Sequence, residues 1–233
     1  MLLCGLCDAG KTTLLCTLAT GASPKTTTSL QHSVLSLPLS AQGLQGTVTL
    51  VDVPGHPRIR GSSLQQFQEL TAAIAFLVDA VQFPNNSRLV ADYLYEVLIH
   101  PVFKERQVPV LVVCNKYDII TASPINKIKS TLESELYVLL ILILFVCFIF
   151  LKSFLLLSSR ETIRKTRIAA PSTQEGGDGD AALGELQLGT NQVFSFEQLV
   201  NPISFVPCSV LKKTCDQQDS LDRLVKFLIE KQL

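Results

Sequence analysis

The sequence predicts an α/β fold in which a doubly wound, mostly parallel sheet carries helices on both faces. Three observations predict it. Short, almost continuous apolar runs suit the strands of a parallel sheet that is covered on both sides. These runs alternate with segments of helical periodicity, which is the order of elements in a doubly wound sheet. Polar motifs close several of the runs, and such sheets bind ligands beyond the carboxyl ends of their strands.

Three buried strands and two helices follow from the spacing of the apolar residues. The strands are expected at residues 48–52, 73–79 and 108–114. Helical periodicity predicts helices at residues 63–72 and 86–99, with Asn86 as the N-cap of the second. A further amphipathic helix, packing on the sheet, is expected at residues 220–233.

The composition excludes some classes of function. The 233 residues include 20 Lys plus Arg and 20 Asp plus Glu, so the formal net charge is zero. A neutral chain has no general attraction for polyanions, so direct binding of nucleic acid is not expected. The seven cysteines are scattered and form no disulfide framework, which favours the reducing cytosol as the compartment of the domain.

The first motif is a complete phosphate-binding loop near the N-terminus. Residues 5–12 read GLCDAGKT and match the pattern G-x-x-x-x-G-K-[ST]. The glycines allow backbone N–H groups to surround phosphate oxygens, while Lys11 supplies a positive charge and Thr12 an oxygen for Mg²⁺. The helix that follows directs its positive end at the same anion. By itself the loop does not distinguish ATP from GTP.

Two later motifs together indicate a GTPase, and the second of them selects guanine. Residues 52–55 read DVPG at the end of a predicted strand, where the Asp52 carboxylate can hold the shell of Mg²⁺ and the Gly55 N–H can contact a γ-phosphate. Residues 115–118 read NKYD at the end of another strand, and Asp118 can accept two hydrogen bonds from the guanine edge. Adenine offers no such pair of donors. The three motifs together predict a P-loop GTPase domain with GTP and Mg²⁺ as its ligands.

Beyond these motifs, the chain resembles one branch of the small GTPase superfamily. The stretch GLCDAGKTTLL is similar to the Arf and Sar families. The stretches TTTSL, TLVDVPGH, AIAFLVDA, DYLYEVLIH, VLVVCNKYDI, RIAAPST and FSFEQL are most similar to the beta subunits of the signal recognition particle receptor. This resemblance covers nearly the whole chain except residues 137–159.

The resemblance also implies which residues bind the nucleotide. The phosphate loop comprises Gly5, Leu6, Cys7, Asp8, Ala9, Gly10, Lys11, Thr12 and Thr13. Switch I holds Thr26, Thr27, Thr28 and Ser29, and switch II holds Gly55. The base is contacted by Asn115, Lys116, Asp118, Ser209 and Val210, although family members often carry alanine in place of Val210. The implied Mg²⁺ ligands are Thr12, Thr28 and, through water, Asp52. His56 either positions the attacking water or is a surface residue of the switch.

The function implied by the resemblance is a GTP switch that anchors and regulates the receptor's alpha subunit during co-translational protein targeting. The domain would be held at the endoplasmic reticulum membrane and face the cytosol. GTP hydrolysis is expected to be slow and dependent on the partner. Two other interpretations stay open: an Arf- or Sar-like GTPase of vesicle traffic, and a non-hydrolysing interaction module locked in one nucleotide state.

A long apolar run conflicts with this site. Residues 137–157 read YVLLILILFVCFIFLKSFLLL and are long enough to span a membrane. Basic residues follow the run, so a spanning helix would leave the residues after it in the cytosol and the residues before it in the lumen. Asp118 and Ser209 would then lie on opposite sides of a bilayer, and no guanine site could form.

We therefore expect residues 137–159 to be an apolar insertion, either translated intron sequence or another gene-model error, or a membrane-like segment outside the domain. Ile125, Ile128, Leu132 and Leu136 mark one face of a helix, and removal of the insertion brings Ile163 four positions after Leu136. The chain then divides into residues 1–136, the front of the GTPase domain, residues 137–159, and residues 160–233, the rest of the domain with a mobile loop at 169–192. The membrane helix implied by the resemblance is expected upstream of Met1.

Overall fold

The computed structural model describes residues 1–22, 26, 29, 31–41, 44–165 and 194–210. At its centre lies a six-stranded sheet with the order β2-β3-β1-β4-β5-β6. Neighbouring strands are parallel except for the antiparallel pair of β2 and β3. The predicted doubly wound, mostly parallel sheet is therefore confirmed. The strands are β1 (Leu2–Gly5), β2 (Ser33–Ala41), β3 (Leu44–Asp52), β4 (Ile74–Asp79), β5 (Val110–Asn115) and β6 (Ile203–Pro207).

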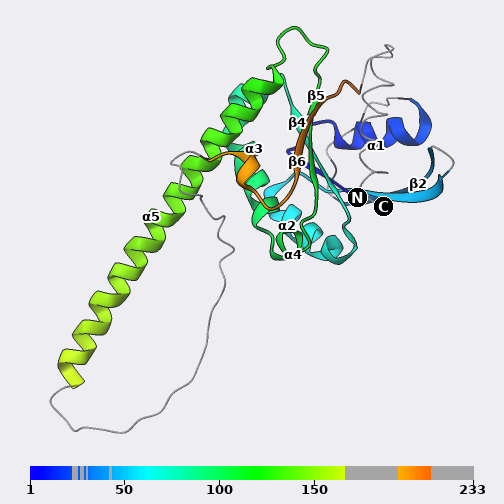
Figure 1. Cartoon of the computed structure of the whole chain (residues 1–233). Coiled ribbons are helices and arrows are strands. Elements are labelled where there is room, and N and C mark those ends of the chain that lie inside the picture. Colours follow the sequence, from blue (N-terminus) through cyan, green and yellow to red (C-terminus); the bar gives the residue numbers. More distant parts are fainter. Residues whose placement is uncertain (23–25, 27–28, 30, 42–43, 166–193, 211–233) are drawn as a thin grey trace.

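Helices cover both faces of this sheet (Figure 1). Helix α1 (Lys11–Thr20) packs on one face through Leu14 and Leu15. The other face carries α2 (Pro57–Phe67), α3 (Phe83–Ile99), α4 (Pro101–Glu105) and the first part of α5 (Ile125–Lys165). Two short 3₁₀ helices, η1 (Gln68–Leu70) and η2 (Phe196–Gln198), complete the described elements.

The alternation of side chains in the central strands builds one core on each face of the sheet. In β4, Ile74, Phe76 and Val78 contact the helices on the α3 side, whereas Leu77 faces the α1 side. All of these side chains are buried because parallel strands covered on both faces leave no surface for water. This double burial explains why the predicted strands appear in the sequence as continuous apolar runs.

Some predicted boundaries are wrong, and proline accounts for two of them. Helix α3 begins at Phe83 with a proline in its first turn and Gln82 as its N-cap, so Asn86 lies inside the helix. Helix α2 begins at Pro57, several residues before the predicted start. Proline suits the first turn of a helix because the N–H it lacks has no partner there. The two edge strands, β2 and β6, were not predicted, and β2 contains Pro38.

An ion pair fastens α2 to α3. Arg60 on α2 is 7 % exposed, and its Nε donates to Glu96 Oε2 of α3 at 2.8 Å. The guanidinium also lies 4.3 Å from the centre of the Tyr93 ring, in a cation–π contact. A buried charge is stable only when it is paired, so Glu96 and Tyr93 together hold α2 against the domain.

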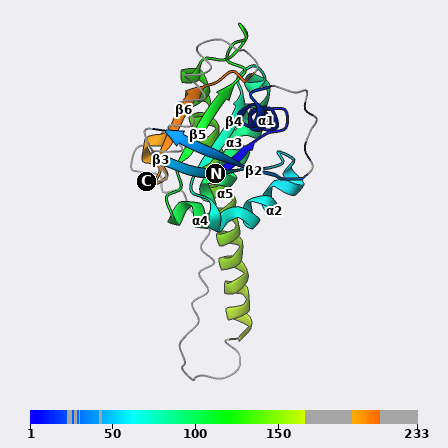
Figure 2. The same cartoon turned by 90° about the vertical axis from the view of Figure 1, so that its right-hand side faces the viewer.

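Helix α5 is continuous over 41 residues and extends far beyond the rest of the domain (Figures 1 and 2). Its predicted apolar face is confirmed, since Ile128, Leu132 and Leu136 are fully buried. Among the side chains that the structure describes, Leu140, at 4 % exposure, is the last of this face that packs on the domain. Every residue from 141 to 149 is exposed. Packing on the domain therefore ends within the apolar run.

The chain returns to the same domain after α5. Glu133 of α5 accepts hydrogen bonds from the N–H of Phe196 at 3.2 Å and from Ser195 Oγ at 3.4 Å. Strand β6 then pairs with β5. The residues before and after the apolar run thus belong to one sheet. The predicted mobile loop at 169–192 and the predicted helix at 220–233 lie outside the described residues.

Candidate nucleotide-binding site

The phosphate loop connects β1 to α1 through a sharply turned backbone. Asp8 has a φ of 62° and Gly10 a φ of 92°, both in the left-handed region. A side chain on Gly10 would collide with the amide group of Asn115, so only glycine fits where the two loops meet. Such a turn directs successive N–H groups inward, which is the arrangement that binds phosphate oxygens.

The side chain of Lys11 folds back over this loop. Its Nζ donates to the carbonyl oxygens of Gly5 at 2.9 Å and Leu6 at 2.8 Å, and the residue is only 7 % exposed. Burial lowers the pKa of Lys11, and the nearby Asp52 carboxylate partly opposes this shift. A desolvated ammonium group of this kind gains strongly from an anion, so Lys11 fits the outer phosphates of a nucleotide.

Thr12, Asp52 and Ser29 form a cluster of oxygens at the end of β3. Thr12 Oγ1 donates to Asp52 Oδ2 at 2.5 Å and lies 3.2 Å from Ser29 Oγ. Burial raises the pKa of Asp52, an effect that the Thr12 hydrogen bond and the Lys11 charge oppose. The other carboxylate oxygen, Oδ1, is buried and has no partner among the described residues. Such an unsatisfied oxygen beside two hydroxyl groups fits a hydrated Mg²⁺.

Only part of the predicted switch I is described. Thr27 and Thr28 lie outside the described residues, so the position of Thr28 relative to this oxygen cluster stays a prediction. Thr26 Oγ1 lies 3.1 Å from Thr13 Oγ1, and Ser29 reaches Thr12 as described above. Both described residues of the segment therefore contact the start of α1.

Switch II touches the phosphate loop through backbone. A side chain at Gly55 would approach the Cys7 nitrogen to 2.5 Å, so glycine permits this close contact. The next residue, His56, is exposed and caps α2, with Nδ1 accepting a hydrogen bond from the Arg58 N–H at 3.3 Å. His56 does not line the cleft described below.

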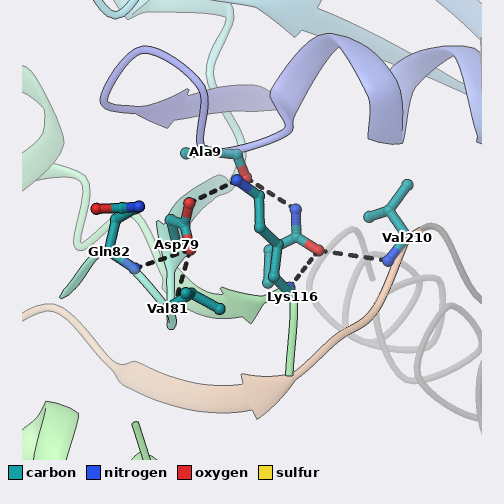
Figure 3. A network of polar contacts seen from close by, with 7 residues as sticks. Ala9, Asp79, Val81, Gln82, Lys116 and Val210 are labelled. Carbon is teal, nitrogen blue, oxygen red and sulfur yellow. Dashed lines mark hydrogen bonds and ion pairs between the residues drawn. The ribbon is translucent and has the colours of Figure 1, made fainter. Parts of the chain in front are cut away.

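The opposite end of the site is built from the loops after β5 and β6. Asn115 Nδ2 donates to the carbonyl oxygen of Ala9 in the phosphate loop at 2.8 Å. Asn115 Oδ1 accepts a hydrogen bond from the N–H of Val210 at 3.3 Å, which is the dashed line that ends at Val210 in Figure 3. Ser209 Oγ donates to Asp118 Oδ1 at 2.5 Å. Asn115 therefore ties both base loops to the phosphate loop.

These loops enclose one cleft of about 270 Å³. Predicted residues line most of it: Cys7, Asp8, Gly10, Lys11, Thr12, Thr13, Thr26, Ser29, Gly55, Asn115, Lys116, Asp118 and Val210. Other predicted residues do not line it, although each contacts a residue that does: Gly5, Leu6, Ala9, Asp52 and Ser209. Pro54 and Ile119 line it without having been predicted, and their places next to Gly55 and Asp118 were the available signal.

The fold and this cleft together define a P-loop nucleotide-binding protein of the small GTPase class. Comparison with known proteins agrees. A family model described as the signal recognition particle receptor beta subunit matches residues 1–141. The human signal recognition particle receptor subunit beta is 34 % identical over 210 residues, covering 90 % of this chain and 67 % of its own length. The Saccharomyces cerevisiae protein of the same name is 35 % identical over 142 residues, covering 58 % of this chain and 55 % of its own.

The chain belongs to the family of signal recognition particle receptor beta subunits. Solved structures support the assignment. The structure of the mammalian receptor has a TM-score of 0.66 at 29 % identity, covering 98 % of this chain and 97 % of that one. The SRb-GTP/SRX complex from Chaetomium thermophilum has a TM-score of 0.64 at 24 % identity, covering 99 % and 96 % of the two chains, and shows a shared fold.

Proposed function

We propose that this chain binds GTP with Mg²⁺ and works as the beta subunit of the signal recognition particle receptor in co-translational protein targeting. The observation that carries the proposal is the convergence of four segments of the chain in one cleft. The phosphate loop, the end of β3 and the two base loops meet there, and Asn115 bonds to Ala9 and Val210 across it. A guanine nucleotide needs these groups at the two ends of one cleft.

Each part of the cleft has a role in this proposal. Lys11 and the phosphate-loop N–H groups hold the phosphates, and Asp118 reads the guanine edge. Thr12, Thr28 and, through water, Asp52 hold Mg²⁺, which would supply positive charge to the β- and γ-phosphates. Gly55, already against the phosphate loop, would detect the γ-phosphate through its N–H.

The proposed partner is the alpha subunit of the receptor, at the endoplasmic reticulum membrane with the domain facing the cytosol. Membership of the receptor family and the 29 % identity to a chain of the mammalian receptor structure support this partner. The proposed switch surface consists of residues 26–29 and α2. Thr26 and Ser29 line the cleft, and α2 begins two residues after Gly55, which lines it as well.

Calorimetric titration of the full chain, purified in detergent, tests this function. GTP and GDP are expected to bind at least about a thousandfold more tightly than ATP, because adenine leaves the Asp118 carboxylate without the two donors that guanine supplies. The N-terminal domain of the receptor's alpha subunit should be retained by the GTP-loaded chain and lost with GDP. Equal affinity for ATP, or no nucleotide binding, would contradict the proposal, whereas rapid GTP turnover without the alpha subunit would favour an Arf- or Sar-like enzyme.

We further propose that His56 positions the attacking water when the partner is bound. His56 directly follows Gly55, and its cap on α2 uses Nδ1, so Nε2 is the nitrogen that would meet a water. The ion pair of Arg60 with Glu96 holds α2 in place. Because the Arg58 N–H bonds to His56, the imidazole is held at the start of this helix. His56→Ala should lower partner-stimulated hydrolysis without changing GTP affinity.

We also propose that residues 137–159 are an insertion, outside the working GTPase domain. Among the described side chains, the buried face of α5 ends at Leu140. Every residue from 141 to 149 is exposed, on all sides of the helix. Among the described residues, the stretch Ile125–Ile149 is the one long and apolar enough to cross a membrane, and its most apolar 18 residues have a mean hydropathy of 2.4. A crossing would separate β6 from β5, which contradicts their pairing.

Thiol labelling gives a prediction that needs no mutation. Cys7 is exposed and lines the cleft, so iodoacetamide should alkylate it at pH 8. GDP with Mg²⁺ at ten times its dissociation constant should slow this reaction about tenfold by occupancy alone. Burial raises the pKa of Cys4 and Cys114 to about 12, so both stay protonated and unreactive. Mass spectrometry of tryptic peptides measures each site.

The exposed Cys147 on α5 is the internal control for this labelling, since it lies outside the cleft. Its reaction rate should not depend on nucleotide. Equal slowing of Cys7 and Cys147 would indicate a general effect of GDP, and an unprotected Cys7 would argue against nucleotide in this cleft.

A further inference from the structure

Asp79, the last residue of β4, uses its two carboxylate oxygens for separate contacts. Oδ1 accepts the N–H groups of Val81 at 2.9 Å and Gln82 at 3.2 Å, just before α3 begins. Oδ2 accepts a hydrogen bond from Lys116 Nζ at 2.5 Å, as Figure 3 shows. The side chain of Asp79 is only 12 % exposed. One carboxylate thus joins the start of α3 to the NKYD loop.

Lys116 adopts a backbone conformation that needs support. Its φ of 60° lies in the left-handed region, which is strained for a residue other than glycine. Two hydrogen bonds hold it there: its N–H donates to Asn115 Oδ1 at 2.8 Å, and its Nζ donates to Asp79. Lys116 stands between Asn115 and Asp118, so its conformation sets the direction in which Asp118 leaves β5.

The side chain of Lys116 is also a wall of the nucleotide cleft. It lines this cleft and a neighbouring cavity of about 330 Å³ toward α3, which Asp79 and Gln82 line as well. Lys116 is 30 % exposed, so its long side chain has room to move into that cavity. The charge of Asp79 opposes such movement because the paired carboxylate is nearly buried.

We propose that Asp79 is a positioning residue for guanine recognition, acting through Lys116. The inference rests on the proposed binding of guanine nucleotide. Asp79 does not line the cleft, whereas Lys116, Asn115 and Asp118 do. Its negative charge fixes the Lys116 side chain, and Lys116 in turn fixes the NKYD loop, in which Asn115 bonds to Ala9 and Val210. The phosphate loop reaches its ligand without this ion pair.

Asp79→Asn tests the role of the charge in the full chain, purified in detergent. The asparagine oxygen still accepts the N–H groups of Val81 and Gln82, so the start of α3 is preserved. The NH₂ group of the asparagine then faces the Lys116 ammonium group, and because both are donors no hydrogen bond forms between them. We expect GDP affinity to fall about tenfold, as for the loss of one charge-assisted hydrogen bond. Competition by inorganic pyrophosphate, which has no base, should change less than twofold.

Two further variants separate positioning from general destabilisation. Asp92→Asn removes the same charge from α3 at a position that lines neither cavity, and it should leave GDP affinity unchanged. Lys116→Met removes the group on which Asp79 acts. On that background Asp79→Asn should have no further effect on GDP affinity, which a purely structural role of Asp79 would not produce.

Each outcome is decisive. Wild-type affinity in Asp79→Asn, an equal loss of pyrophosphate binding, or a full additional loss on the Lys116→Met background would overturn the inference. If the wild-type chain itself bound no guanine nucleotide, the proposed function would fail instead. The thermal midpoint of every variant, measured without nucleotide, shows whether a loss of folding accounts for a loss of binding.

Discussion

Deletion of residues 137–159 is expected to turn a chain that aggregates in water into a monomeric protein that binds guanine nucleotide. The exposed side chains at 141–149 are apolar on every side of α5, and an apolar patch of this size drives association. The deletion joins Leu136 to Arg160 and brings Ile163 to the position of Leu140, which is 4 % exposed. The buried face of α5 is then complete and its outer surface is polar.

Size-exclusion chromatography with light scattering measures the change in assembly, and fluorescent GDP measures binding. Nucleotide affinity should stay within about threefold of that of the full chain in detergent, because the deleted stretch lies away from the cleft. An unfolded deletion variant, or one that has lost GDP binding, would refute the insertion hypothesis. Continuous transcripts through these codons would argue against an intron origin.

Deletion of residues 137–161 is the matched control. It removes two more residues, which moves Ile163 to the position of Val138, at 51 % exposure, and Lys165 to the buried position of Leu140. The apolar face is then interrupted by a charge. We expect the free energy of unfolding to fall by about 2 kcal/mol relative to the first deletion. Equal stability of the two variants would show that the domain does not need Ile163 in the buried position that Leu140 now occupies.

Asp118→Asn is expected to change the base that the site prefers from guanine to xanthine. Asp118 lines the cleft, and Ser209 Oγ orients its carboxylate by donating to Oδ1. Guanine presents two N–H donors, whereas xanthine presents one donor and one oxygen, which match an amide. Affinity for GTP should fall about a hundredfold or more, since the amide N–H group opposes a guanine donor. Affinity for xanthosine triphosphate should rise.

The ratio of the two affinities, from competition titrations, is the measurement that matters. Asp8→Asn makes the same chemical change at the phosphate end of the cleft and should leave this ratio unchanged. A variant of Asp118 that bound both nucleotides equally weakly would indicate damage to the loop. One that still preferred GTP would show that Asp118 does not read the base.

The arrangement of the sheet and the loop motifs could be predicted because their signals are local. A strand buried on both faces must be apolar at every position, as β4 is. A phosphate loop must have glycine at position 10, where the backbone turns and Asn115 approaches. Helix starts were less predictable. Helices α2 and α3 begin at prolines or directly before one, at Pro57 and Phe83, whereas the prediction relied on polar N-cap residues such as Asn86. Strand β2 was missed although its leucines alternate with small residues.

By itself, the sequence determined the class of sheet with the central strands β3, β4 and β5, the three nucleotide motifs, and the conflict between the apolar run and the guanine site. Only the tertiary structure decided that Ser29 reaches Thr12, that packing on α5 ends at Leu140, and that Asp79 pairs with Lys116. The reason is physical. Motifs record constraints between residues that are close in the sequence. These contacts join residues that are far apart in the sequence, and they depend on which elements the fold brings together, which local spacing does not encode.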